Sequence, residues 1–591
     1  MDPGAAASAR SWAVPAVAVV ASTLLVLGPA LGGGYVLRYD MVFAPHMPLG
    51  AAQFGLGSQL PRDVPSDLVA AALTHVLTGA AVQDLVLAAL LLAAGFGAAR
   101  LALPAAVPRT AAALAYLWTP YFGERLLLGQ WAVLVGWAGL PWVVRAARDL
   151  RRAPPGAARS AWARLAFATG VQCLGGVSAW TLAVLVVPVA VGWDGGVAAR
   201  RRAARVGAGL ALLAVYALPW ALPALTRPGG VGADPAGARV FAPSPDTPLG
   251  TVPSLLTGGG IWNSQAVPPG RDAVVPALGA LVLLALALAG LWRSRRDPVI
   301  ASLAVSAVVG LGIAVATAWP SGARVLSRLA FAAMLRDSQR LLAPWVLLLA
   351  LGLAWSIAGL AAHASRNLSG AVVLLALLPV AVLPALAWGV SGRLAPVEYP
   401  GDFARVRALL AADPVPGAAV VVPWSTYRRF PWNDGRVVLD PLAQWLDRPV
   451  IAASDLPVRV GPTTVVVHGE DRLAARVGAA LAGGSPSPVS RALGRLGVRW
   501  VVADAPIGAR LRGDLRSADL PLRVAYRGRY LTAFRIPTSA LDRHAADDVY
   551  RAYAPPAAVV VTGDILAALV LVGSGLCTAP AVRRPRLVSA C

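Results

Sequence analysis

The sequence predicts an α-helical polytopic membrane protein with about 12 transmembrane helices and a C-terminal extracytoplasmic α/β domain. Three observations support this fold class. The 591-residue chain is 57% hydrophobic and only 14% charged, whereas soluble domains are about 25% charged. Apolar runs of membrane-spanning length recur along the chain. Between Gly392 and Pro555 these runs shorten and alternate with charged residues.

Charge and cysteine content exclude several other classes. The formal net charge is +23, but the arginines concentrate in short loops between apolar runs. Membrane topology therefore explains them better than nucleic-acid binding does. The three cysteines, Cys173, Cys577 and Cys591, have no clustered spacing. They indicate neither a disulfide framework nor a zinc site, and the sequence predicts no metal ligands.

The predicted membrane helices begin with the apolar run 12–31. We expect this run to be an uncleaved first helix, because it is nearer to membrane-spanning length than the apolar region of a signal peptide. The run 179–193 is short, so the hairpin around Trp180 can be partly re-entrant. The remaining runs are 81–103, 106–121, 126–146, 160–177, 206–225, 273–292, 298–318, 341–361, 368–390 and 556–578.

Arginine-rich loops predict the orientation. The densest are 145–159, 198–205, 293–297 and 583–586, and such loops are usually cytoplasmic. We expect a multi-pass protein of the plasma membrane with a cytoplasmic N-terminus. The predicted organisation is a transmembrane domain (1–390) with extracytoplasmic loops 32–80 and 226–272, an extracytoplasmic α/β domain (391–555), and a last helix with a basic cytoplasmic tail (556–591).

The stretch "SGARVLSRLAFAAMLRDSQRLLAPW" (321–345) departs from this charge rule, because it places arginines on the external side. One interpretation is an amphipathic interfacial helix whose arginines meet lipid headgroups. The other is a binding site for an anionic headgroup, since a planar guanidinium suits phosphate. The arginines concerned are Arg324, Arg328, Arg336 and Arg340.

The pattern within 391–555 predicts alternating helices and strands. The segment "PWSTYRRFPWNDGR" (423–436) contains Trp424 and Tyr427. It is suited to carbohydrate, which stacks on aromatic rings, or it is a loop packed on the membrane domain. We expect helices at 403–413, 470–484 and 487–497, and strands at 417–423, 498–504, 522–528 and 530–537, the last two forming a hairpin.

No nucleotide-binding or hydrolase motif occurs in a suitable context, which argues against ATP-driven transport. Charged residues within the spans are few, which weakens an ion-coupled transporter. Polar residues gather instead at the external ends of helices. Asp40 follows the first span, Glu124 and Arg125 occupy a tight connection, and Asp246 lies in the loop 226–272. This pattern suggests a reaction on a lipid-linked phosphorylated substrate.

A long loop with an acidic residue after the first span, many spans, and a C-terminal extracytoplasmic α/β domain together resemble the GT-C superfamily of polyprenyl-phosphate-sugar glycosyltransferases. The stretch "TPYFGERLLLGQWAVLVGWAGLPW" (119–142) is similar to the NP-aromatic-x-ERL-x-x-G-x-W stretch of bacterial members. The segments "LRDSQR" (335–340) and "LGVRWVV" (496–502) also resemble that group, especially large actinobacterial envelope enzymes. Many members have two neighbouring acids in the first loop, whereas "RYDM" has only Asp40 and the next acids are Asp63 and Asp67.

The resemblance implies roles for particular residues. Asp40 would deprotonate the acceptor hydroxyl, and cationic groups would stabilise the departing phosphate. Glu124 is the second catalytic candidate. Alternatively, Asp40 pairs with Arg38 or caps a short helix, and Glu124 forms an ion pair with Arg125 that fixes the turn. The candidate substrate-binding residues are Arg125, Arg324, Arg328, Arg336, Arg340, Asp246, Trp424 and Tyr427.

We therefore expect a glycosyltransferase that moves a sugar from a polyprenyl-phosphate donor to an envelope glycan or lipid. Membrane lipids are expected partners and nucleic acid is not; no cofactor is identified, and a divalent cation is left open. The alternative is a non-catalytic envelope assembly or transport protein whose α/β domain binds a partner. The enzyme hypothesis requires Asp40, Glu124 and the arginines of 324–340 to converge on one cavity, whereas the alternative lets them scatter.

Overall fold

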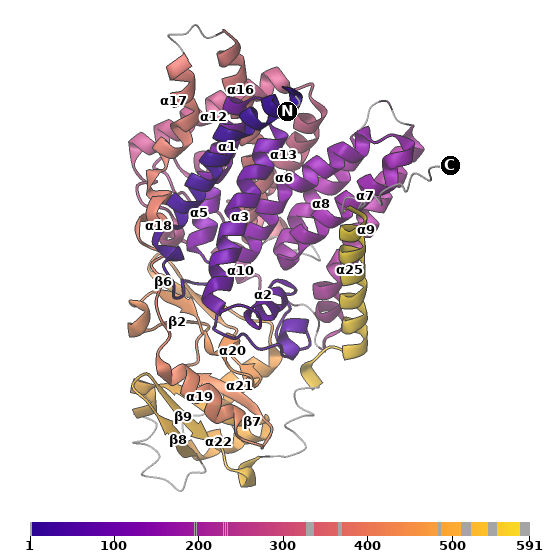
Figure 1. Cartoon of the computed structure of the whole chain (residues 1–591). Helices are drawn as coiled ribbons and strands as arrows, with labels where there is room; N and C mark the ends of the chain where they lie inside the picture. Colours follow the sequence, from indigo (N-terminus) through magenta and orange to yellow (C-terminus); the bar gives the residue numbers. More distant parts are fainter. Residues whose placement is uncertain are drawn as a thin grey trace, which may run out of the picture.

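The computed structural model describes residues 3–578 apart from 194–195, 197, 229, 231, 233, 327–335, 364–368, 483–485, 510–521 and 542–551. Long helices form a bundle in the upper part of Figure 1, and a smaller α/β domain lies below it. The first helix runs from the far end of the bundle toward this domain. The chain is therefore a mostly helical protein with a small sheet region near its C-terminus, as predicted.

Each of the predicted apolar runs contains a helix, but the predicted count of 12 spans is not confirmed. Among the described residues, seven helices are long and apolar enough to cross a membrane, or eight if the bent pair Gly370–Val382 and Pro384–Ser391 is one span. Three of the others have 12, 16 and 17 residues. The helices in the runs are α1 (Pro3–Leu27), α3 (Gly79–Leu101), α4 (Ala106–Leu117), α6 (Trp131–Arg152), α7 (Ala158–Cys173), α8 (Gly176–Gly192), α9 (Ala199–Thr226), α12 (Val274–Ser294), α13 (Pro298–Thr317), α16 (Ala343–His363), α17 (Ser369–Val382) and α25 (Ala557–Thr578).

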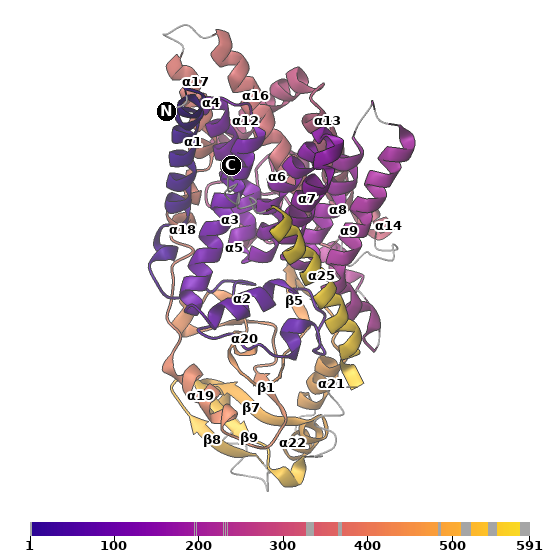
Figure 2. The same cartoon turned by 45° about the vertical axis from the view of Figure 1, so that its right-hand side comes forward.

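Helix α16 is the centre of the bundle. It continues the short helix η5 (Ser338–Leu342), and together they form the apolar segment Ser338–His363. In the most apolar stretch of this segment 83% of the residues are buried, against 22% in α12 and in α25. Gly290 of α12 and Gly352 of α16 bring the two backbones together, because a Cβ at Gly290 would overlap the carbonyl of Gly352. Small residues permit such close approach between membrane helices. Helix α25 lies at the side of the bundle, against α7 and α9 (Figures 1 and 2).

The loop after α1 lies between the bundle and the α/β domain, and it carries the short helix α2 (Ser66–Thr74), as Figure 2 shows. Gln83 of α3 anchors this loop by accepting from Val36 N at 2.8 Å and donating to Val36 O at 2.9 Å. Tyr39 joins the loop to the α/β domain, since its N–H donates to Val437 O at 2.7 Å and its carbonyl accepts from Leu439 N at 2.8 Å. The loop is therefore held from both sides.

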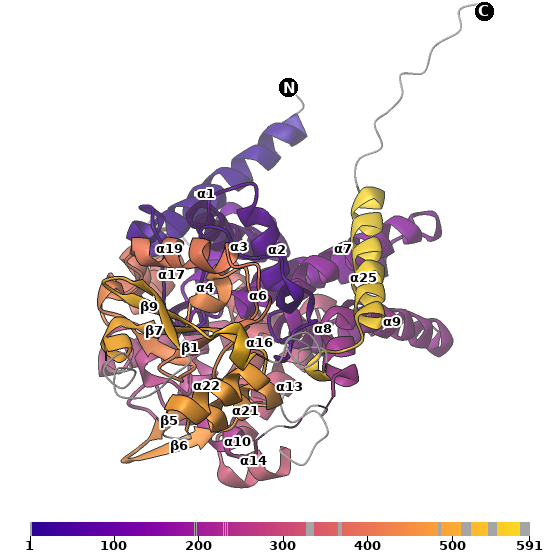
Figure 3. The ribbon, with the colours of Figure 1, turned by 90° about the horizontal axis from the view of Figure 1, so that it is seen from below.

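The α/β domain is built on a five-stranded sheet of order β4-β1-β7-β9-β8, which Figure 3 shows from below. Strands β4, β1 and β7 are parallel, and β7, β9 and β8 are antiparallel. The predicted helices, strands and the β8–β9 hairpin are confirmed to within a few residues. The predicted elements are α19 (Gly401–Ala411), β1 (Ala418–Val422), α21 (Arg472–Leu481), α22 (Pro486–Arg495), β7 (Val498–Asp504), β8 (Arg523–Arg527) and β9 (Leu531–Arg535). The edge strand β4 (Val450–Ile451) was not predicted.

Two small hairpins were not predicted. One pairs β2 (Tyr427–Arg429) with β3 (Val437–Leu439), and the other pairs β5 (Leu456–Val460) with β6 (Thr463–Val467). The strands of the first hairpin have only three residues each, which is too few for a usable alternation of polar and apolar residues. The first hairpin begins inside the aromatic segment 423–436, and its strand β3 follows this segment and reaches the loop that carries Asp40.

Candidate active site

Helix α5 (Pro120–Leu127) places two adjacent charged residues in the interior. Thr119 caps it by accepting from Phe122 N at 3.2 Å, and Pro120 occupies its first turn. Glu124 and Arg125 both have 0% exposure. Adjacent helical residues point in different directions, and the two side chains form no ion pair with each other but are linked through Gln339.

The Arg125 guanidinium contacts three polar side chains and so joins them into one network. It donates to both carboxylate oxygens of Asp337, one of them at 2.9 Å, and to the side-chain oxygens of Gln130 and Gln339. Asp337 adopts a left-handed backbone conformation with φ 54°. A fully buried arginine is tolerated because both of its terminal nitrogens donate to side-chain oxygens and its charge is paired with Asp337.

Glu124 forms a carboxyl pair with Asp246. Gln339 Nε2 donates to Glu124 Oε2 at 2.8 Å, Arg271 Nε donates to Asp246 Oδ2 at 3.0 Å, and the two acids hydrogen-bond each other. Burial and the neighbouring Asp246 raise the pKa of Glu124 well above its usual range. Burial also opposes ionisation of Asp246, but Arg271 and its hydrogen bonds outweigh this and lower the pKa. These opposite shifts favour a proton on Glu124 facing an ionised Asp246.

Gly259 makes room for the carboxyl pair. A Cβ at this position would overlap Asp246 Oδ2 and lie 2.8 Å from Arg271 Nη2. The Gly259 carbonyl also accepts from Gln339 Nε2 at 3.3 Å. The loop between α11 (Thr251–Leu256) and α12 thus reaches the network only because glycine lacks a side chain.

Asp40 lies at the other side of the network, partly exposed, in the loop after α1. Its N–H donates to Leu128 O at 3.2 Å. This contact depends on Gly129, which has φ +75° and leaves no room for a Cβ beside Arg38 O. Its carboxylate accepts from the Tyr427 hydroxyl and from Gln130. The alternative of pairing with Arg38 is not observed.

The Arg38 guanidinium donates instead to the carbonyls of Leu127 at 2.8 Å and Gln265 at 3.0 Å. Burial raises the pKa of Asp40 to about 6, and the carboxylate of Asp63 adds to the rise, while the bonds from Tyr427 and Gln130 oppose it. Asp63 is the next acid of the same loop, so folding brings a second carboxylate toward Asp40 from a distant point in the sequence.

One continuous polar network therefore joins the loop after α1 to the interior of the bundle. Its order is Asp40, Gln130, Arg125, Gln339, Glu124, Asp246 and Arg271. Sequence analysis missed Gln130, Asp337, Gln339 and Arg271. The first three lie within the stretches "LLLGQW" and "LRDSQR" that carry the GT-C resemblance, so a closer reading of the polar residues in those stretches would have found them.

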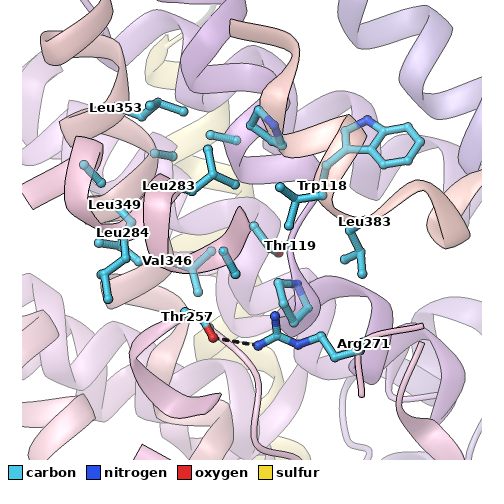
Figure 4. Close-up of a pocket in the computed structure, with 18 residues that line it drawn as sticks. Trp118, Thr119, Thr257, Arg271, Leu283, Leu284, Val346, Leu349, Leu353 and Leu383 are labelled. Atoms are coloured by element: carbon cyan, nitrogen blue, oxygen red, sulfur yellow. Dashed lines mark hydrogen bonds between the residues drawn. The ribbon is translucent and has the colours of Figure 1, made fainter. Parts of the chain in front are cut away.

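An apolar pocket begins at the end of this network. It lies between the ends of α4 and α5 and helices α12, α16 and α17, and its space of about 620 Å³ includes volume that is open to solvent. Figure 4 shows Arg271 and Thr257 at one end of the pocket, joined by a hydrogen bond of 2.7 Å, and leucines along the other end. The leucines and valines are Leu283, Leu284, Val346, Leu349, Leu353, Val382 and Leu383. The pocket combines an apolar wall with one cationic end.

The other predicted residues lie away from this network or at its edge. Arg340 is buried and donates to Ser178 at 3.0 Å, and Arg336 pairs with Glu470 at 3.0 Å. Arg324 is exposed and donates to Pro320 O at 3.2 Å. Trp424 contacts Gly478 of α21 within the α/β domain. Arg328 lies outside the described residues.

The predicted residues that do converge are Asp40, Glu124, Arg125, Asp246 and Tyr427. The segment 423–436 is packed against the loop after α1, since Asn433 Nδ2 donates to Leu37 O at 3.2 Å. In the part of the chain that the structure describes, no group of three or more His, Cys, Asp or Glu side chains is placed to hold a metal ion.

No protein-family model and no curated protein matches the sequence. The chain shares its fold with solved glycosyltransferase structures, and the resemblance of its motifs predicted this fold. With its apolar helices, this fold makes the chain a multi-pass membrane protein.

One such structure is the cryo-EM structure of the arabinofuranosyltransferase AftD from Mycobacteria, with a TM-score of 0.59 and 19% identity over 90% of this chain and 40% of AftD. A mutant of AftD gives a TM-score of 0.55 and 18% identity over 89% of this chain and 42% of that one. The crystal structure of ArnT from Cupriavidus metallidurans bound to undecaprenyl phosphate reaches only 0.38, at 16% identity over 90% of this chain and 98% of that one. The chain spans less than half the length of AftD.

Proposed function

We propose that this protein is a membrane glycosyltransferase that takes a sugar from a polyprenyl-phosphate donor and transfers it to an envelope glycan or lipid. The reaction would take place at the outer face of the plasma membrane, where the loop after α1 and the α/β domain would lie. The observation that carries the proposal is the polar network from Asp40 to Arg271, which links a loop carboxylate to the cationic end of an apolar pocket.

The pocket suits the lipid part of the donor. A polyprenyl chain is apolar and would lie among the leucines of α12 and α16, while the phosphate would pass Arg271 and Thr257 toward the network. Arginine is suited to phosphate because its planar fork gives charge-assisted hydrogen bonds. The tight pairing of Arg271 with Asp246 would keep the guanidinium oriented before the donor arrives.

Asp40 suits the role of general base. In the proposed step its carboxylate accepts the proton of an acceptor hydroxyl, the acceptor oxygen bonds to the anomeric carbon, and the bond from that carbon to the phosphate oxygen breaks. The phosphate leaves with the electron pair and is stabilised by cations. Tyr427 and Gln130 would orient the carboxylate. Glu124, which is held protonated by Asp246, would act as a positioning residue for Arg271 through that pairing.

The donor site is tested with the double variant Arg271→Gln, Asp246→Asn. It removes the cation without leaving an unpaired buried carboxylate. We expect donor affinity to fall roughly ten- to hundredfold, because a charge-assisted hydrogen bond contributes about 1.5–3 kcal/mol. Titration of the purified protein with a polyprenyl-phosphate sugar measures this. Arg324→Gln, at an exposed arginine, is the control and should leave the affinity unchanged.

The reverse result, in which Arg324→Gln weakens donor binding and the double variant does not, would place the phosphate at the external arginines and contradict the pocket assignment.

The raised pKa of Asp40 predicts the acid limb of the pH profile. A base acts only when it is deprotonated, so turnover should be half-maximal near pH 6 and fall about tenfold for each pH unit below it. The folded-state pKa is above the ordinary value, so as pH falls the folded protein takes up this proton before the unfolded chain does. Acidification should therefore remove activity, while protonation of Asp40 does not reduce the free energy of unfolding. An acid limb centred below pH 5 would contradict the assignment.

A further inference from the structure

A second cationic site lies at the opposite end of the bundle from Asp40. It is formed where α1 and α4 begin and where α3 and α6 approach their C-terminal ends, and it contains two tryptophans and several arginines. Arg109 lies over the Trp12 ring, with 4.2 Å from its guanidinium carbon to the ring centroid, and Arg100 lies over the same ring at 5.2 Å. Arg100 is also 5.6 Å from the ring of Trp142.

The cluster has more cations than carboxylates. Arg145 of α6 is close enough to repel Arg100, and Arg100 repels Arg109 in turn. Asp149 is the nearby acid, and it is already engaged by Arg145 at 3.6 Å and Arg148 at 3.3 Å. Within the described residues, no carboxylate pairs with Arg100 or Arg109.

The Arg109 guanidinium does not donate from all of its nitrogens. Its Nη1 donates to the Ser11 hydroxyl at 3.0 Å, but its Nε is buried and has no hydrogen-bond partner among the described residues. Arg100 is exposed and Arg109 is half-buried, so an acceptor from outside the chain can reach these guanidinium groups. Guanidinium groups that repel each other favour an anionic acceptor, and phosphate is the one whose geometry arginine matches best.

We propose that Arg100, Arg109 and Trp12 bind the phosphate of an anionic phospholipid in the leaflet on this side of the membrane. The position of the cluster favours a lipid over a free phosphate. Trp12 lies near the start of the apolar helix Ser11–Leu31 and Arg100 lies in the last turn of α3, so the cluster is at the end of two helices that are long and apolar enough to cross a membrane. Tryptophan prefers the interface between headgroups and acyl chains.

Native mass spectrometry of the full chain in neutral detergent tests this inference. We would titrate it with phosphatidylglycerol, with phosphatidylcholine and with inorganic phosphate. Phosphatidylglycerol should bind one site more tightly than phosphatidylcholine. In Arg100→Gln, Arg109→Gln its affinity should fall roughly ten- to hundredfold, as expected for lost charge-assisted bonds. Arg295→Gln is the matched control, since Arg295 also lies over a tryptophan, Trp292, at 4.5 Å but without a second cation on that ring.

Equal affinity in the double glutamine variant and the wild type would overturn the inference, as would equal affinity for the two lipids or an equal loss in Arg295→Gln. Inorganic phosphate that binds as tightly as the lipid would overturn the lipid assignment. Because the glutamine variant can disturb folding, Arg100→Lys, Arg109→Lys provides a second test. It keeps the charge but loses the planar fork, and it should bind phosphatidylglycerol with intermediate affinity. Wild-type affinity in this folded variant would contradict a site built on guanidinium geometry.

Discussion

Asp40→Asn should lower turnover by roughly 10²–10⁴, which is the usual contribution of a positioned general base. The substitution keeps the size of the side chain and can still accept hydrogen bonds from Tyr427 and Gln130, so folding and membrane insertion should be normal. The amide cannot take up a proton at neutral pH, so the chemical step alone is affected. Steady-state rates on matched amounts of folded protein measure the effect, and donor affinity should be unchanged.

Two companion variants sharpen this result. Asp40→Glu should recover only part of the rate, because the longer side chain displaces the carboxylate. Asp434→Asn is the matched control, since Asp434 carries an exposed carboxylate in the nearby α/β domain and its side chain is 74% exposed. It should retain the wild-type rate. If Asp40→Asn also turned over at that rate, Asp40 would be a structural residue and the enzyme hypothesis would lose its base.

Arg125→Met should destabilise the protein by about 3–5 kcal/mol, the usual cost of removing one partner of a buried ion pair. The reason is the carboxylate of Asp337, which would remain in an interior position without its ion-pair partner. Gln130 and Gln339 would also lose the donor that they share. Denaturant-induced unfolding in detergent, followed by a signal from the helical bundle, measures the loss.

The double variant Arg125→Met, Asp337→Asn separates lost charge pairing from lost packing. It removes both charges, so it should be more stable than the single variant and recover a substantial part of the loss. If both variants were equally unstable, packing around the arginine side chain would dominate, and the ion pair would not be the feature that holds η5 against α5.

Local patterns in the sequence were sufficient to predict most elements of the fold. The strand 498–504 coincides with β7, because a run of β-branched and aromatic residues is a strong local signal. The number of spans could not be predicted in the same way. Hydropathy identifies apolar helices but not their lengths. Helices α4 and α7 are apolar, yet they have only 12 and 16 residues, so they are not among the seven helices that are long enough to cross a membrane.

The candidate site was predictable only in part, because its geometry arises from long-range contacts. The resemblance of the loop after α1 pointed to Asp40, and the ERL stretch pointed to Glu124 and Arg125. The pairing of Glu124 with Asp246 requires a glycine at position 259 and an arginine at 271, and neither has a local signature. The arginines of 321–345 looked alike in sequence, yet Arg340 is buried and Arg324 is exposed, a difference that only packing determines.

The most direct test of the proposed function is a transfer assay with the purified full chain. A panel of polyprenyl-phosphate sugars would be supplied with envelope glycan and lipid acceptors, and both products would be quantified. We predict that the wild type releases polyprenyl phosphate and forms a glycosylated acceptor in equal amounts with at least one donor, and that Asp40→Asn binds the same donor but forms neither product at a comparable rate. A wild-type protein that binds these donors yet releases no polyprenyl phosphate from any of them would contradict the proposal.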